Sequence, residues 1–274
     1  MINNNTMLPI EERDAINRLV REQVIPAIGC TEPICVALAV SRATEELGCR
    51  PQRIMARLSA NILKNAMGVG IPGTGMVGLP IAIALGAIVG KSAYGLEVLR
   101  DSTPDHVKEG QRYIDEQHIS ISLAENAPSK LYVDIIVFDA DGREARAVIA
   151  EQHTNFILVS RGSEVLLDKT LDGGEENTEK KEEVLQLNMR KVFDYATTSP
   201  LEELEFINEA KRLNENAAAR SLEGNYGHCL GKVLSRPLGR GIMGESIFSH
   251  ILSSTSCACD ARMAGAMIPV MSNS

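Results

Sequence analysis

The chain has 274 residues, of which 44% are hydrophobic and 23% charged, a composition typical of a folded globular protein. Its formal net charge of -8 would repel a phosphate backbone, which argues against nucleic acid as a partner. The longest apolar stretch, residues 76–89, contains glycine and proline and is too short for a membrane span of about 20 residues. Six scattered cysteines and an amino terminus without a signal-peptide pattern predict a cytoplasmic protein that has no membrane partner.

Helical patterns dominate the first 50 residues. Apolar positions repeat at the helical period over residues 16–24, and Pro26 is expected to end that helix. A second helix is predicted from Thr31, which can act as its N-cap, to Gly48, which should stop it. Two helices are therefore expected before the first strand.

The middle of the chain predicts a glycine-rich loop and a small sheet. A strand is expected over residues 54–63, followed by the glycine-rich loop at 68–75 and a buried helix in the apolar stretch. Between about 118 and 168 the pattern changes to period two, which predicts four or five antiparallel strands. Asp141 and Gly142 offer the tight turn of one hairpin.

The last third of the chain is predicted to be helical. The highly charged run at 172–183 predicts a linker, and the Ser-Pro-Leu-Glu sequence at 199–202 has the form of a capping box that opens a helix. We therefore predict an α+β fold. Residues 1–171 are expected to hold the amino-terminal helices, the glycine-rich loop and the small antiparallel sheet, and residues 184–274 a mostly helical, incomplete region.

Cys30 is the sharpest candidate for chemistry. It comes directly before the helix expected from Thr31, so free backbone amides and the helix dipole favour its thiolate form. A helix amino terminus can lower the pKa of a thiol below about 8.5, which would make Cys30 a nucleophile or an acid–base group. The alternative is a small buried residue in a turn, because free cysteine is among the most buried residue types.

The glycine-rich loop suggests two kinds of ligand. Gly73, Gly75 and Gly78 match the spacing of a dinucleotide fingerprint, and Glu97 follows at a suitable distance. However, no buried strand directly precedes the loop, which argues against a nucleotide. The same glycines, together with Thr74, can expose backbone amides to a smaller anion such as a carboxylate.

Polar side chains outside the loop can contribute to holding an amino acid. Asn61 and Lys64 offer an amide and a cation just upstream of the loop, although a surface lysine is the simpler interpretation. His153 and Asn155 lie at an expected strand junction, where a lone histidine more often has a structural role. Residues alone thus indicate a folded protein with a reactive-looking cysteine near an anion-binding loop.

Four blocks of the sequence resemble the L-cysteine desulfidase family, relatives of the iron–sulfur L-serine dehydratase alpha chain. The blocks are residues 25–33, 59–80, 153–155 and 260–274. The resemblance implies β-elimination on L-cysteine to give pyruvate, ammonia and hydrogen sulfide. It also implies an oxygen-sensitive 4Fe–4S cluster, whose open iron acts as a Lewis acid, and no pyridoxal phosphate.

The resemblance also implies roles for individual residues. By position, Cys30 corresponds to the catalytic cysteine of the family, in acid–base or thiol chemistry during loss of the β-substituent. The implied substrate-binding residues are Asn61, Lys64, Gly73, Thr74, Gly75, His153, Asn155 and Arg262. The expected partner is a small amino acid, and a homodimer is left open as the assembly.

Two departures from the family pattern concern the cofactor. Family members continue past the position of Ser274, and the resemblance implies that the cluster ligands lie beyond Ser274, so no metal ligand is expected here. Cys257 and Cys259 stand where the family commonly has small residues, and two thiols are too few for a cluster. We therefore expect a carboxyl-terminally truncated member that does not bind the cluster alone. The alternatives are an L-serine dehydratase-type deaminase, an inactive fragment or scaffold, and a dinucleotide-binding protein.

Overall fold

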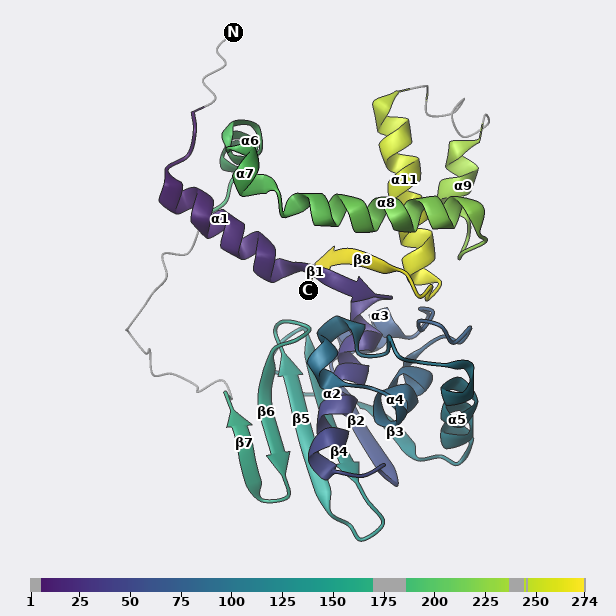
Figure 1. Ribbon diagram of the computed structural model, residues 1–274. Helices are drawn as coiled ribbons and strands as arrows, with labels where there is room; N and C mark the ends of the chain where they lie inside the picture. Colours follow the sequence, from purple (N-terminus) through teal and green to yellow (C-terminus); the bar gives the residue numbers. More distant parts are fainter. Residues whose placement is uncertain (1–5, 170–185, 237–243, 245, 274) are drawn as a thin grey trace.

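The computed structural model describes residues 6–169, 186–236, 244 and 246–273 (Figure 1). Helices and one main sheet make up these parts of the chain, which confirms the predicted α+β fold. The linker expected at 172–183 lies outside the described residues, and so does Ser274, the last residue of the fourth resemblance block. No helix within the described ranges is long and apolar enough to cross a membrane.

The amino-terminal helices form largely where the sequence predicts them. Helix α1 (Ile10–Gln23) ends before Pro26, and the next residues form strand β1 (Val24–Ile28). Helix α2 (Thr31–Leu47) ends at Gly48, whose φ of 75° is the left-handed conformation expected of a stop. The predicted N-cap is wrong by one residue: Cys30 is the N-cap, and Thr31 is the first helical residue.

The main sheet has the strand order β3-β2-β4-β5-β6-β7. Its strands are β2 (Arg53–Leu58), β3 (Ile119–Leu123), β4 (Tyr132–Phe138), β5 (Glu144–Ala150), β6 (Phe156–Arg161) and β7 (Glu164–Asp168). Antiparallel pairing is confirmed for β4 to β7, with the expected turn at Asp141 and Gly142. It is wrong for β3, which runs parallel to β2 because a long helical crossover separates the two strands.

The crossover from β2 to β3 contains the glycine-rich loop. The strand expected over 54–63 stops at Leu58, because Ser59 caps helix α3 (Ala60–Ala66) by accepting a hydrogen bond from the Ile62 amide at 3.5 Å. The loop then leads into α4 (Leu79–Ile88), the buried helix predicted from the apolar stretch. The 3₁₀-helix η1 (Ser92–Glu97) and α5 (Pro104–Asp115) complete the crossover.

The two faces of the sheet differ in character. Val133, Ile135 and Val137 alternate along β4 and are buried in the core that α2 and α4 share with the sheet. On the opposite face, Asp134 is buried beneath two arginines. Its carboxylate accepts from Arg146 Nε at 2.8 Å and lies 2.6 Å from Arg57 Nη2. Helices therefore cover one face, while the other carries this charged group next to a small apolar cluster that includes Val148 and Ala150.

The carboxyl-terminal part is mostly helical, as predicted. Its elements are α6 (Met189–Thr198), α7 (Leu201–Leu204), α8 (Ile207–Glu223), α9 (Leu230–Ser235), α11 (Ile247–Met263) and strand β8 (Pro269–Asn273). The capping box predicted at 199–202 is wrong. Pro200 is the N-cap of the short helix α7 and no side chain caps it, because Ser199 lies one residue too early for its hydroxyl to reach the first-turn amides.

The beginning and the end of the described chain meet in a second sheet. Strands β1 and β8 pair antiparallel, with Ile28 opposite Pro269 and Val24 opposite Asn273. Figure 1 shows this pair between the main sheet and the carboxyl-terminal helices. The pairing crosses the division that the sequence suggests between residues 1–171 and 184–274, and it brings the end of α11 close to the start of α2.

Candidate functional site

A chain of hydrogen bonds links Cys30 to two polar side chains. The Cys30 thiol donates to Glu32 Oε2 at 3.1 Å. The other carboxylate oxygen, Glu32 Oε1, accepts from Asn65 Nδ2 at 3.1 Å. Cys30 is the N-cap of α2, Glu32 lies in its first turn, and Asn65 lies in the last turn of α3. These contacts orient both the thiol and the carboxylate.

The turn before α2 fixes the place of Cys30. Gly29 has a φ of 84°, a left-handed conformation that only glycine adopts without strain. A Cβ atom at this position would lie 2.5 Å from Cγ of Pro72 in the glycine-rich loop. A residue larger than glycine would therefore separate the loop from the start of α2.

The pKa of Cys30 is raised, not lowered as predicted from its place before a helix. Burial raises the pKa from 9.0 to about 11, and the hydrogen bond to Glu32 and the negative charge of Glu32 add to the effect. The positive charge of Arg262 acts in the opposite direction but does not outweigh them. Cys30 is therefore a protonated thiol near neutral pH.

The pKa of Glu32 shifts in the opposite sense. Burial alone would raise it, but hydrogen bonds from Cys30, from its own backbone amide and from Asn65 bring it below its usual value. The charge of His153 lowers it further. A thiol that keeps its proton thus lies next to a carboxylate that stays ionised, an arrangement typical of acid–base pairs.

Two of the residues predicted to bind substrate lie next to this pair. Arg262, at the end of α11, donates from Nε to the Gly29 carbonyl at 3.1 Å, which places its charge beside Cys30. His153 lies close enough to Glu32 to influence its pKa. The structure therefore brings the end of α11 and the turn between β5 and β6 to the start of α2.

The glycine-rich loop does not form the anion cradle expected from its sequence. Thr74 Oγ1 donates to the Ile71 carbonyl at 2.8 Å and accepts from the Met76 amide at 2.9 Å, so this hydroxyl holds the loop together. The amide of Gly73 donates to the Gly265 carbonyl at 3.0 Å. The loop amides that donate within the protein are those of Gly70, Ile71, Gly73, Thr74, Met76 and Gly78.

The loop therefore binds the end of α11 through backbone hydrogen bonds, and few of its amides are left to donate to a ligand. Helix α3 precedes it, where a nucleotide fingerprint needs a strand. Gly75 is exposed at the tip of the loop.

The other predicted residues have different surroundings. Asn61 and Lys64 are exposed on α3, and Asn61 shares a helix face with Asn65, one turn away. Asn155 donates from Nδ2 to the Ala150 carbonyl at 3.1 Å, which closes the turn between β5 and β6. Asn155 thus stabilises a turn. Asn61 lies on the same face of α3 as Asn65, which binds Glu32.

Sequence reasoning missed Glu32 and Asn65. Both stand inside the blocks that carry the family resemblance, and Glu32 comes two residues after Cys30. A carboxylate in the first turn of a helix ordinarily indicates stabilisation of the helix dipole. The contact with the thiol depends on how the first turn is buried, which the sequence does not show.

The described residues do not fit a complete 4Fe–4S ligand set. Such a cluster takes three or four thiolates, and no group of three or more histidine, cysteine, aspartate or glutamate side chains within the described ranges could hold a metal. Cys257 is buried against Gly231, whereas Cys259, two residues further along α11, is exposed. Positions two apart on a helix do not face each other, so these thiols do not form a common site.

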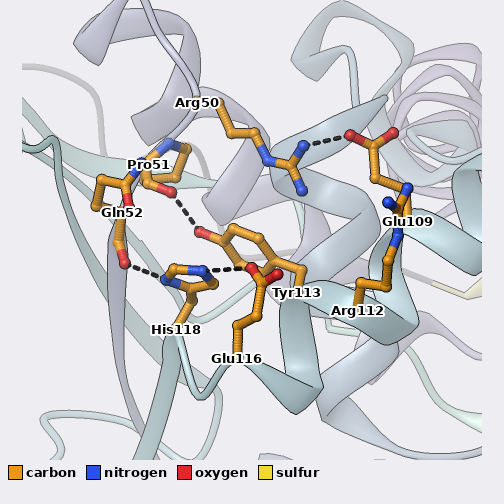
Figure 2. A pocket seen from close by; sticks show the side chains of 8 residues that line it. All are labelled: Arg50, Pro51, Gln52, Glu109, Arg112, Tyr113, Glu116 and His118. Carbon is orange, nitrogen blue, oxygen red and sulfur yellow. Dashed lines mark hydrogen bonds and ion pairs between the residues drawn. The ribbon is translucent and has the colours of Figure 1, made fainter.

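A separate cavity of about 490 Å³ lies at the opposite end of α2 (Figure 2). Its polar side chains pair with one another: Arg50 with Glu109, and His118 Nε2 with Glu116 at 2.9 Å. The ring of Tyr113 stacks on His118 with 4.5 Å between centroids. Because α2 has 17 residues, this cavity is about 25 Å from Cys30, so it is not part of the candidate site.

The chain is similar to proteins named UPF0597. It is 62% identical over 269 residues to a UPF0597 protein of Phocaeicola vulgatus. This match covers 98% of this chain and 62% of that protein. One of Bacteroides fragilis is 60% identical over 263 residues, and one of Porphyromonas gingivalis 43% over 259 residues. The chain spans about 60% of the length of these curated relatives. No protein-family model matches the chain, and no solved structure matches it.

Proposed function

We propose that this chain carries the acid–base site of an L-cysteine desulfidase, which converts L-cysteine to pyruvate, ammonia and hydrogen sulfide. The observation that carries the proposal is the 3.1 Å contact between the Cys30 thiol and the Glu32 carboxylate. The sequence resemblance supplies the reaction, and this pair supplies groups that can move its protons. Both residues lie in the first block of that resemblance.

The elimination needs two proton transfers. A base removes the proton from Cα, the electron pair of that bond forms the Cα–Cβ double bond, and the sulfur leaves with the Cβ–S electron pair and gains a proton. The aminoacrylate product then adds water and releases pyruvate and ammonia. L-cysteine and water are consumed in equal amounts, so no oxidant or reductant is required.

The raised and lowered pKa values suggest how the roles are divided. Cys30 keeps its proton near neutral pH, so we assign it as the acid that protonates the leaving sulfur. Glu32 stays ionised and is held by Asn65, so we assign it as the base. Arg262 uses Nε to bind Gly29, and its Nη groups are the donors that we assign to the substrate carboxylate.

The cofactor of the proposed reaction is not assigned to this part of the chain. The family resemblance implies a 4Fe–4S cluster and no pyridoxal phosphate, but the described residues do not fit a cluster by themselves. The cluster ligands expected beyond Ser274 stay a prediction, and we derive no step through the cluster. We place the reaction in the cytoplasm, because all six cysteines are free thiols, as a reducing compartment maintains them.

The test is anaerobic release of pyruvate and sulfide from L-cysteine after iron–sulfur reconstitution. It compares this chain alone with the chain joined to the segment that the Phocaeicola vulgatus relative carries outside the match. In the active form, Cys30→Ala should reduce the rate at least about 100-fold, since it removes the proposed acid. Cys49→Ala, which alters an exposed thiol beyond the other end of α2, should leave the rate unchanged.

Three results would count against the proposal. Absence of L-cysteine-dependent product in both forms would exclude the desulfidase. Full activity of a folded Cys30→Ala variant would remove Cys30 from the reaction. Faster release of pyruvate from L-serine than from L-cysteine would replace the proposal with an L-serine dehydratase-type deaminase.

A further inference from the structure

Helix α11 is turned with its small residues inward and its large apolar residues outward. The buried positions are Ser249, Ser253, Cys257 and Ala261. The exposed apolar side chains, each between 49% and 77% exposed, are Ile247, Phe248, Ile251 and Leu252. A helix on the surface of a protein ordinarily buries its large apolar side, so α11 presents a face suited to a further partner.

The composition of this helix supports the same conclusion. Residues 247–259 contain no aspartate, glutamate, lysine or arginine. Exposed helix faces are ordinarily rich in charged side chains, and contiguous exposed apolar patches indicate sites of interaction. The charged residues of α11, Asp260 and Arg262, stand at the end near Cys30.

A groove of about 470 Å³ continues this face toward the candidate site. Leu222 of α8, Ala258 and Cys259 of α11 and Met271 of β8 line it. Ile251 is two turns before Ala258, so it lies on the same stripe of α11. We call the exposed apolar side chains of α11 together with this groove the α11 face.

The length of the relatives indicates what covers the α11 face. The matched region makes up only 60% to 62% of the UPF0597 proteins of Bacteroides fragilis and Phocaeicola vulgatus, and 60% of the more distant one of Porphyromonas gingivalis. Each relative therefore has about two fifths of its length outside the matched region, and we call this remainder its additional segment. We propose that this segment binds to the α11 face and buries the apolar side chains of that face.

The groove lies close to the candidate site around Cys30. Arg262 lines the groove and also donates to the Gly29 carbonyl next to Cys30. A segment bound on the α11 face therefore comes to lie beside Cys30. This inference does not depend on the proposed function, because it concerns only the apolar face and the segment that covers it.

Thiol reactivity tests the inference directly. Cys259 lines the groove and is exposed, and Cys49 is exposed near the cavity at the far end of α2. Iodoacetamide should modify both thiols in this chain alone. In the chain joined to the additional segment of the Phocaeicola vulgatus relative, modification of Cys259 should slow at least about tenfold, whereas Cys49 should react as before.

A pair of variants distinguishes binding of the segment to the α11 face from a general effect of adding an exposed charge. Ile251→Asp, at a position that is 55% exposed, should restore the reactivity of Cys259 in the joined chain. Leu166→Asp, at a 40% exposed position on β7, should not. If the joined chain does not fold, the complete Phocaeicola vulgatus protein serves instead, with a cysteine at the position that aligns with Cys259.

Two outcomes would overturn the inference. In the first, Cys259 of the folded joined protein reacts as fast as in this chain alone, which shows that the segment lies elsewhere. In the second, Cys259 of this chain alone becomes protected as the protein concentration rises, which shows that a second copy occupies the face.

Discussion

Cys30 illustrates which properties of a single residue can be predicted from sequence. Its position before a helix is correct, because Gly29 and the proline-containing segment after it mark the boundary. The predicted ionisation is wrong, because burial and the carboxylate of Glu32 outweigh the favourable end of the helix dipole. Neither the burial nor the direction of the Glu32 side chain is visible in the sequence.

The raised pKa of Cys30 gives a prediction for its reactivity. Alkylation of Cys30 should increase with pH up to about 11, because its thiol stays protonated above the ordinary value of 9.0. Glu32→Gln should shift this profile to lower pH, since it removes a negative charge next to the thiol. Mass spectrometry of Cys30 modification at each pH gives the midpoint, and Cys49 controls for loss of the reagent.

The same shift affects stability in a defined direction. A thiol whose pKa is raised in the folded protein contributes stability below pH 9, and this contribution disappears as the pH rises through about 11. An alkylation midpoint at or below 9 in the unmodified protein would contradict both expectations. So would a midpoint that Glu32→Gln leaves unchanged.

At the scale of elements, most local patterns were correct, although the N-cap at Thr31 and the capping box at 199–202 were not. Contacts between distant segments could not be predicted. The left-handed Gly48, the turn at Asp141 and Gly142 and the period-two strands were each predicted from neighbouring residues. The parallel pairing of β3 and the role of the glycine-rich loop depend on segments far away in the sequence. The loop binds the end of α11, whose approach no local pattern indicates.

The contact between the loop and α11 predicts different effects of two glycine substitutions. Gly75 and Gly265 have similar φ values, 67° and 70°. A Cβ at Gly75 meets open space, whereas one at Gly265 lies 2.6 Å from the backbone of Gly70. Gly75→Ala should therefore cost about 1 to 2 kcal/mol, and Gly265→Ala at least about 2 kcal/mol more, since backbone must move. Urea unfolding measures both, and equal losses would exclude the close approach.

At the scale of the whole molecule, the pairing of β1 with β8 connects the two ends of the described chain. Val270, opposite Ala27 in this pair, is buried among residues of α8 and α11. The strands of the main sheet pack around a separate and larger core. No sequence pattern predicts the pairing, because almost the whole 274-residue chain lies between the partners.

This organisation predicts that the two parts can be destabilised separately. Val270→Asp places an unpaired carboxylate in the small core, which costs several kcal/mol. Hydrogen exchange should become faster at the amides of β1, β8 and α8, while β4 and β5 keep their protection. Val165→Asp, at an exposed position of β7, is the control. A uniform loss of protection would show that the molecule unfolds as one unit.

The β1–β8 pair also sets an order of events during synthesis. Strand β1 leaves the ribosome before its partner, which follows only after the 240 residues between them, 29–268, have been translated. At about 5–20 residues per second, β1 waits on the order of ten to fifty seconds for β8. The main sheet is complete before then, whereas the contact of Arg262 with Gly29 forms only after α11 emerges. Cys30 thus spends this interval without the arginine that later lies beside it.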